Sequence, residues 1–189
     1  MPEKLSLDEK KQLLTIAREA VNATALNQPL PRLDPHAYSY TLIENGASFV
    51  TLTIAGRLRG CIGTLEAYQP LYLDVQKRAV QAASQDPRFT PLTPAELKQV
   101  KIEVSRLSQP EPLEYNTPEE LLTLLKPGVD GVILSEGHRR ATFLPQVWDE
   151  LPDARHFLAQ LCRKMGCSPT LWEHKKLDVA IYHVEEFSE

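Results

Sequence analysis

The stretch F-V-T-L-T-I-A-G-R-L-R-G-C-I-G-T-L, residues 49–65 of a chain of 189 residues, has the pattern of two strands joined by a turn. Its first six residues are rich in β-branched and aromatic side chains, and Ala55-Gly56-Arg57 has the composition of a tight turn. We therefore predict a β-hairpin whose second arm begins at Leu58. That arm is unusual, because a glycine inside a strand weakens packing and marks a bulge or a close approach of another group to the backbone.

Helices are predicted on both sides of this hairpin. Ser6-Leu7-Asp8-Glu9 is a capping box, and apolar residues recur at helical spacing after it, so we expect a helix over 7–26. A second helix is expected over 70–84, with an apolar stripe in which alanines allow close packing. Threonine caps followed by proline, at Thr93 and Thr117, each predict the start of a short helix.

The remaining patterns predict further strands and one more helix. K-I-E-V-S, residues 101–105, alternates between apolar and polar side chains, and S-E-G-H, residues 135–138, has the composition of a second hairpin turn. A helix follows the cap at Asp153, and the alternation over 177–183 predicts a last strand. Helices and hairpin-linked strands together indicate an α+β fold with an antiparallel or mixed sheet. We expect one domain over 1–189, with a seam between a larger and a smaller lobe near 108–112.

Composition and charge narrow the classes of partner. The net charge is only -4, from 21 basic and 25 acidic residues, and the chain has no run of lysine or arginine. We therefore expect no nucleic-acid partner. No apolar run is long enough to span a bilayer, and the first twenty residues lack the apolar core of a signal peptide, so we expect no membrane partner and a cytoplasmic location.

The sequence also predicts neither a metal site nor a cofactor. The five histidines do not have metal-ligand spacing, and the three cysteines form no C-x-x-C pair, so reduced thiols are expected. Motifs for binding dinucleotides or phosphates, and the nucleophile elbow of hydrolases, are missing from the sequence. The strongest chemical candidate is therefore a thiol.

That thiol is Cys61, in the arm with the two glycines. A strand places Arg59 and Cys61 on one face, where a guanidinium would favour the nucleophilic thiolate, and Gly60 and Gly63 would let a ligand approach the backbone. The alternative is that Cys61 is a buried packing residue, Arg59 a structural ion-pair partner, and the glycines an accommodation to a close helix.

Two other segments supply candidate site residues. Asp86-Pro87-Arg88-Phe89 is a loop that would bring the carboxylate of Asp86 and the guanidinium of Arg88 over the glycine-bearing strand. The alternative is a turn in which Asp86 binds backbone N–H groups and Phe89 anchors the loop in the core. Glu103, on the polar face of its strand, would line a site or be simply solvated.

Five motifs, in this order, resemble the AMMECR domain family and cover most of the chain from about Phe49 onward. They are L-R-G-C-I-G-T (58–64), the alanine-rich helix, D-P-R-F (86–89), T-P-x-E-L (93–97) and I-E-V-S (102–105). Later segments resemble its prokaryotic branch, called AmmeMemoRadiSam system protein A. The sequence departs from the family pattern around 147–155 and at Met165, away from Cys61.

The resemblance implies an α+β fold with an antiparallel sheet in two lobes. It also implies two partners, a Memo-like protein and a radical S-adenosylmethionine (radical SAM) enzyme, but no particular reaction. Two hypotheses follow. In the first, the chain is an enzyme or substrate-handling subunit, with Cys61 as nucleophile or thiol carrier, Arg59 holding the thiolate or an anionic substrate, and Asp86 or Glu103 transferring protons. In the second, it is a non-catalytic module that binds one of these partners.

Overall fold

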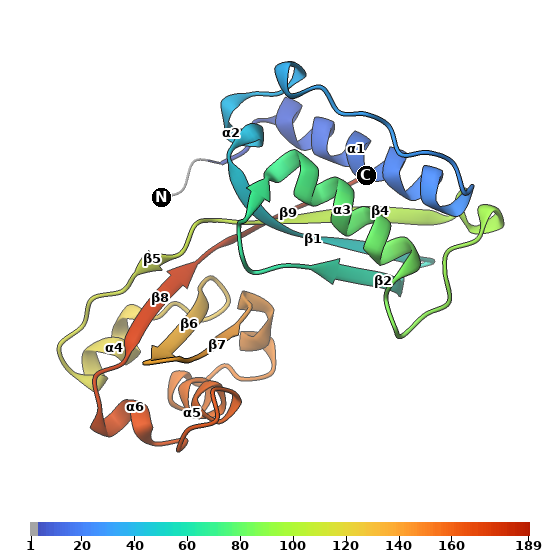
Figure 1. Ribbon diagram of the computed structural model, residues 1–189. Helices are drawn as coiled ribbons and strands as arrows, with labels where there is room; N and C mark the ends of the chain where they lie inside the picture. Colours follow the sequence, from blue (N-terminus) through green and yellow to red (C-terminus); the bar gives the residue numbers. More distant parts are fainter. Residues whose placement is uncertain (1–3) are drawn as a thin grey trace. The chain divides into compact units, whose positions relative to one another are not determined.

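The computed structural model describes residues 4–189, and the chain forms two compact units (Figure 1). The first unit contains the residues up to Ser108 together with Glu185–Glu189, and the second runs from Gln109 to Val184. Helices and antiparallel sheets are present, which confirms the α+β class. That the two units act as one domain stays a prediction.

The first unit is a sheet with the strand order β2-β1-β4-β9, and a short strand β3 pairs with β1. Its elements are α1 (Leu7–Ala25), η1 (Pro35–Ala37), α2 (Tyr40–Ile43), β1 (Asn45–Ile54), β2 (Arg57–Gly63), β3 (Gln69–Pro70), α3 (Leu71–Ser84), η2 (Pro94–Glu96), β4 (Val100–Leu107) and β9 (Val184–Ser188).

The hairpin predicted from the opening stretch is present. β1 and β2 are antiparallel, and Ala55 and Gly56 make the turn with φ angles of 50° and 74°. Two positive φ angles in a two-residue loop match the right-handed twist of the flanking strands. The register shifts between Leu52 and Thr53, which leaves Arg59 as the extra residue of a β-bulge.

Helices α1 and α3 lie side by side on one face of this sheet (Figure 1). The capping box at Ser6 starts α1 as predicted. Alternate residues of β1 and β4 pack against the apolar sides of the two helices, and we call this side of the sheet the helix face. Its core includes Leu13, Ile16, Ala17, Ala20 and Val21 of α1, Val75, Ala79 and Ala82 of α3, Val50 and Leu52 of β1, and Ile102 and Val104 of β4.

The second unit is built around a sheet with the strand order β5-β8-β6-β7. Trp148 and Phe157 stack at the centre of its core with ring centroids 3.7 Å apart. The elements are β5 (Glu111–Pro112), α4 (Pro118–Leu124), β6 (Gly131–Glu136), β7 (Arg139–Phe143), η3 (Pro145–Asp149), α5 (Ala154–Lys164), α6 (Leu171–His174) and β8 (Asp178–Tyr182).

The end of the chain differs from the prediction. The expected last strand over 177–183 is β8, but the chain continues into β9, which pairs with β4 at the edge of the first sheet. The sequence V-E-E-F-S of β9 carries two adjacent acidic residues and no clean alternation. An edge strand tolerates such residues because one of its sides is not paired, so hydrophobic periodicity does not reveal it.

Candidate functional site

The candidate site residues meet at β2, an edge strand of the first sheet. Cys61 pairs with Thr51 of β1, and Thr51 pairs on its other side with Glu103 of β4. These three residues therefore form one row across three strands. The row lies on the side of the sheet opposite α1 and α3, which we call the far face.

The two glycines of β2 are explained by packing within the chain. A Cβ on Gly60 would lie 2.3 Å from the carbonyl oxygen of Ala82 in α3, and a Cβ on Gly63 would lie 2.1 Å from the ring of Phe49. Real Cβ atoms do not approach other atoms so closely. The groups that approach the strand are thus a helix and an aromatic ring, so the space that was predicted for a ligand holds protein atoms.

Asp86 and Arg88 hold the outer edge of β2 at Cys61. The backbone N–H of Cys61 donates to Oδ2 of Asp86 at 2.9 Å, and Nη2 of Arg88 donates to the carbonyl oxygen of Cys61 at 3.3 Å. Arg88 also donates to both carboxylate oxygens of Asp86, at 2.9 and 2.7 Å. The pair satisfies backbone groups that an edge strand leaves without a strand partner.

Asp86 and Arg88 differ in burial, and their contact affects the pKa of Asp86. Hydrogen bonds from Arg88 hold the pKa of Asp86 well below its usual range, against the opposing effect of burial. Asp86 is therefore ionised at neutral pH and positions the backbone of Cys61, and its predicted role in proton transfer stays a prediction. The Asp86 side chain is 2% exposed, whereas that of Arg88 is 54% exposed.

The guanidinium that contacts Cys61 belongs to Arg88. The alternation of the strand had predicted Arg59 as the arginine beside Cys61. Asp86 first, and then the thiol of Cys61, raise the pKa of Arg88. Arg59 is instead the bulged residue, and its side chain makes a two-pronged ion pair with Glu96 at 2.7 and 3.1 Å. The bulge breaks the strict alternation on which the prediction for Arg59 rested.

Phe89 lies between the two arginines. The guanidinium carbon of Arg59 is 5.9 Å from the ring centroid and that of Arg88 is 5.6 Å from it. Both distances are in the range of cation–π interactions. Phe89 is half-buried, so it packs against charged groups at the surface of the first unit and does not anchor the loop in the core.

The far-face row has the chemical groups for thiol chemistry. The hydroxyl of Thr51 donates to Sγ of Cys61 at 3.3 Å, and the Cys61 residue is partly exposed. Burial, and then repulsion from Glu186, raise the pKa of Glu103. A carboxyl group with a raised pKa is better suited to proton transfer near neutral pH than an ordinary one.

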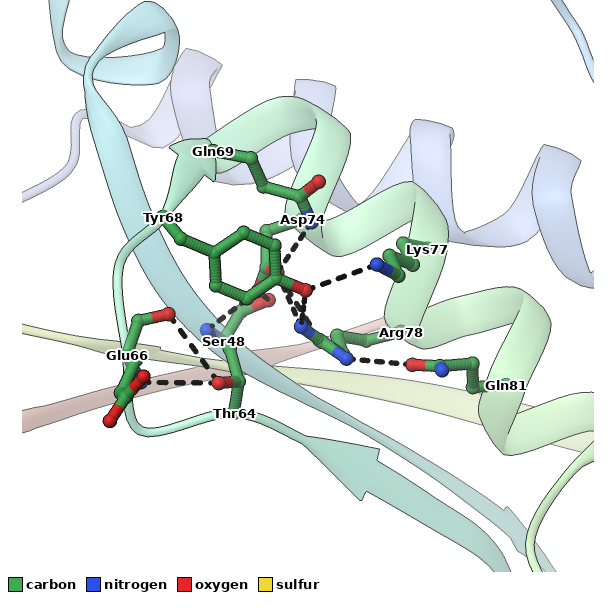
Figure 2. A network of polar contacts seen from close by, with 9 residues as sticks. All are labelled: Ser48, Thr64, Glu66, Tyr68, Gln69, Asp74, Lys77, Arg78 and Gln81. Atoms are coloured by element: carbon green, nitrogen blue, oxygen red, sulfur yellow. Dashed lines mark hydrogen bonds and ion pairs between the residues drawn. The ribbon is translucent and has the colours of Figure 1, made fainter.

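The first unit also contains a second polar cluster, drawn in Figure 2, that was not predicted from the sequence. It is centred on Asp74 and Arg78 of α3, both of which are buried. The signal was present in the sequence: these residues are four apart, and each directly precedes Val75 or Ala79 of the apolar stripe. Opposite charges at i and i+4 on the border of a buried stripe indicate a buried ion pair.

The described residues contain neither a metal-ligand cluster nor a membrane-spanning helix. Among residues 4–189, no group of three or more His, Cys, Asp or Glu side chains could hold a metal ion. No helix in the same range is long and apolar enough to cross a membrane. The predictions of no metal and no cofactor stay predictions.

Relatives extend over nearly the whole chain. A protein of Methanothermobacter thermautotrophicus is 38% identical over 98% of this chain and 96% of its own length, and protein MK0488 of Methanopyrus kandleri is 34% identical over 100% and 92%. The crystal structure of protein PH0010 from Pyrococcus horikoshii matches with a TM-score of 0.80 at 32% identity, over 99% of this chain and 94% of that one. The AMMECR1 family model matches residues 14–187, and the chain belongs to the AMMECR1 family.

Proposed function

We propose that this protein is a substrate-handling subunit with a reactive thiol at Cys61, working with a Memo-like protein and a radical SAM enzyme. The contacts of Cys61 are the observation that supports a reactive thiol. Thr51 donates to Sγ, and the half-exposed side chain of Arg88 donates to the carbonyl oxygen of the same residue. The partners are proposed from the resemblance described above.

Each neighbour of Cys61 has a separate part in the proposed chemistry. The positive charge of Arg88 and the hydroxyl of Thr51 favour the thiolate, which is the nucleophilic form of cysteine. Glu103, across Thr51 on the far face, is the candidate proton-transfer group. Asp86 fixes both Arg88 and the backbone of Cys61, so it acts through these groups and does not contact the substrate.

Alkylation of the folded protein by iodoacetamide, read by peptide mass spectrometry, tests the thiol site. Cys162 is the internal control, because it is fully buried and burial raises the pKa of its thiol. We expect Cys61 to react at pH 7 while Cys162 stays unmodified. We expect Arg88→Gln to slow the alkylation of Cys61 several fold. Arg88→Lys, which keeps the positive charge, should recover part of the alkylation rate.

The matched control is Arg59→Gln, because Arg59 is also an arginine and lies on the same strand as Cys61, but its side chain pairs with Glu96. It should leave the Cys61 rate near that of the unmodified sequence. Circular dichroism of each variant checks that it is folded. A Cys61 that reacts only when the protein unfolds would contradict the thiol site and favour the alternative, a module that binds partners without chemistry.

The partner proposal needs a separate experiment. The chain, the Memo-like protein and the radical SAM enzyme would be co-expressed, with an affinity tag on this chain only, and co-purified. Recovery of at least one untagged partner in a stable ratio supports the proposal. Separate elution of all three proteins under conditions that preserve their fold contradicts it, whatever the reactivity of Cys61.

A further inference from the structure

A fully buried carboxylate organises the second polar cluster. Asp74 accepts hydrogen bonds from the backbone N–H of Ser48 at 3.0 Å and from its hydroxyl at 2.7 Å. It also accepts from Nε2 of Gln69 at 2.8 Å and from Arg78 (Figure 2). A buried charge is tolerated only when it is paired and hydrogen-bonded in this way.

The guanidinium of Arg78 is held rigidly by these contacts. Its Nε and Nη2 donate to Oδ1 of Asp74 at 3.2 and 3.0 Å, and its Nη1 donates to Oε1 of Gln81 at 2.7 Å. The residue is only 6% exposed. Its Nη2 also donates to the hydroxyl oxygen of Tyr68. The cluster thus leads from a buried carboxylate through a fixed guanidinium to a phenol.

Tyr68 brings this cluster to the surface of the first unit. It is 51% exposed and lies in the segment that joins β2 to β3. Nζ of Lys77 donates to the same hydroxyl oxygen at 3.1 Å, so two cations converge on one phenol oxygen (Figure 2). The hydrogen bond from Lys77 is the main cause that lowers the pKa of Tyr68, and the charge of Arg78 adds to it.

The charges of the cluster favour a negative group at that oxygen. Asp74 pairs with Arg78, and Lys77, the other cationic side chain of the cluster, contacts the phenol oxygen. Glu66 is on the same segment as Tyr68, and Figure 2 draws its contacts to Thr64. Loss of the phenol proton, or addition of an anionic group to the oxygen, would place negative charge beside both Lys77 and Arg78.

We propose that Tyr68 is a second reactive residue, a nucleophilic phenol that takes electrophilic phosphoryl or sulfonyl groups carried by anionic molecules. In the step, the phenol proton passes to solvent, the phenol oxygen bonds to phosphorus or sulfur, and the bond to the leaving group breaks with its electron pair. The phosphate or sulfonate ester so formed keeps its oxygens near Lys77 and Arg78. The step involves no oxidation or reduction. This site is independent of Cys61.

A purely structural role makes a different prediction. If Tyr68 only fastens its segment to α3, its oxygen would be no more nucleophilic than that of another exposed tyrosine. Tyr40 is the matched comparison within the chain, because it is 73% exposed and its pKa is raised, first by a hydrogen bond with Glu44. The two phenols are both accessible but have opposite electrostatic surroundings.

Labelling by a pair of sulfonyl fluorides tests the proposal directly. The probes are 4-(fluorosulfonyl)benzoate, which is anionic, and its neutral methyl ester, and peptide mass spectrometry reads each tyrosine. We expect Tyr68 to be labelled several fold faster than Tyr40 at pH 7.5, because the cations beside Tyr68 lower its pKa, whereas Glu44 raises that of Tyr40. At Tyr68 the benzoate should react faster than the ester.

Lys77→Gln is the informative variant, because Lys77 is exposed and its loss leaves the buried pair of Asp74 and Arg78 intact. It should slow labelling of Tyr68 several fold, whereas Lys11→Gln, which removes an exposed lysine of α1, should not. Equal labelling rates at Tyr68 and Tyr40, or a Tyr68 labelling rate that Lys77→Gln leaves unchanged, would overturn the proposal that Tyr68 is reactive. Equal rates for the two probes would overturn the preference for anionic molecules.

Discussion

Asp86 accepts the backbone N–H of Cys61 at 2.9 Å, so a buried carboxylate from one loop fixes the strand residue that carries the candidate thiol. Arg88 from the same loop contacts the carbonyl oxygen of Cys61. The D-P-R-F motif thus closes over the edge of the strand that carries the L-R-G-C-I-G motif. Two motifs that are separated in sequence form one structural unit.

The first prediction concerns this contact. Asp86→Ala leaves the Cys61 N–H without its carboxylate partner and removes the acceptor of Arg88. Because a hydrogen bond to a charged group contributes about 1.5–3 kcal/mol, we expect the free energy of unfolding to fall by about that amount. Urea denaturation followed by circular dichroism measures it. A loss smaller than about 0.5 kcal/mol would show that the contact does not stabilise the strand.

The glycines of β2 give a prediction that separates packing from ligand binding. Gly60→Ala forces a methyl group against the backbone carbonyl of Ala82, so we expect a loss of about 1–3 kcal/mol or more in the free energy of unfolding. At Gly63 the obstacle is the side chain of Phe49, so Phe49→Leu should restore part of the loss caused by Gly63→Ala. Thermal unfolding checks both, and a well-tolerated Gly60→Ala would contradict the packing.

The ion pair of Arg59 and Glu96 predicts a dependence of stability on pH. Hydrogen bonds from Arg59, with help from Thr93, lower the pKa of Glu96 from 4.5 to about 2. A lowered carboxyl pKa means that the stabilisation is complete above the unfolded value and is lost as the pH falls from about 4.5 towards 2.

Comparison of the unmodified sequence with Glu96→Gln by urea denaturation tests this dependence. The difference in free energy of unfolding should be at most about 1 kcal/mol above pH 5, because the pair is partly exposed, and should shrink below pH 4.5. A difference that stays constant down to pH 3 would show that the charge of Glu96 is not what stabilises the fold.

Glu103 should show the opposite behaviour. Because its pKa is raised in the folded state, ionised Glu103 disfavours folding, and this cost grows as the pH rises above 4.5. We therefore expect Glu103→Gln to raise the free energy of unfolding at pH 7 by less than about 1 kcal/mol, with no gain at pH 4. Denaturation at the two pH values checks the sign, and a variant that is less stable at pH 7 would contradict it.

Local signals in the sequence predict much of the fold. The capping box at Ser6, the turn at Ala55-Gly56 and the threonine caps all specify their elements through contacts within a few residues, and the structure confirms them. Strand β9 escapes prediction because its partner β4 lies far away in sequence. Its place depends on tertiary pairing and not on its own periodicity.

The sequence pointed to several residues that lie close together at β2, but it did not predict their contacts. The sequence brought attention to Cys61, Asp86 and Arg88, and the structure places these residues together. The sequence did not reveal the bulge at Arg59, because a bulge depends on the pairing of β1 with β2. It therefore did not predict that Arg88, and not Arg59, would be the arginine in contact with Cys61. The spacing of Asp74 and Arg78 was visible in the sequence, but their contacts with Ser48 and Tyr68 were not, since these side chains come from separate elements.

The pH dependence of Cys61 alkylation is the most direct test of the proposed thiol site. Iodoacetamide rates would be measured from pH 5 to pH 10 on the folded protein, with Arg88→Gln in parallel. We predict that Cys61 of the folded protein is alkylated at neutral pH and that Arg88→Gln slows this reaction several fold, because a neighbouring cation favours the nucleophilic thiolate. Equal rates for the two proteins at every pH, or no alkylation of Cys61 until the protein unfolds, would contradict the proposed thiol site.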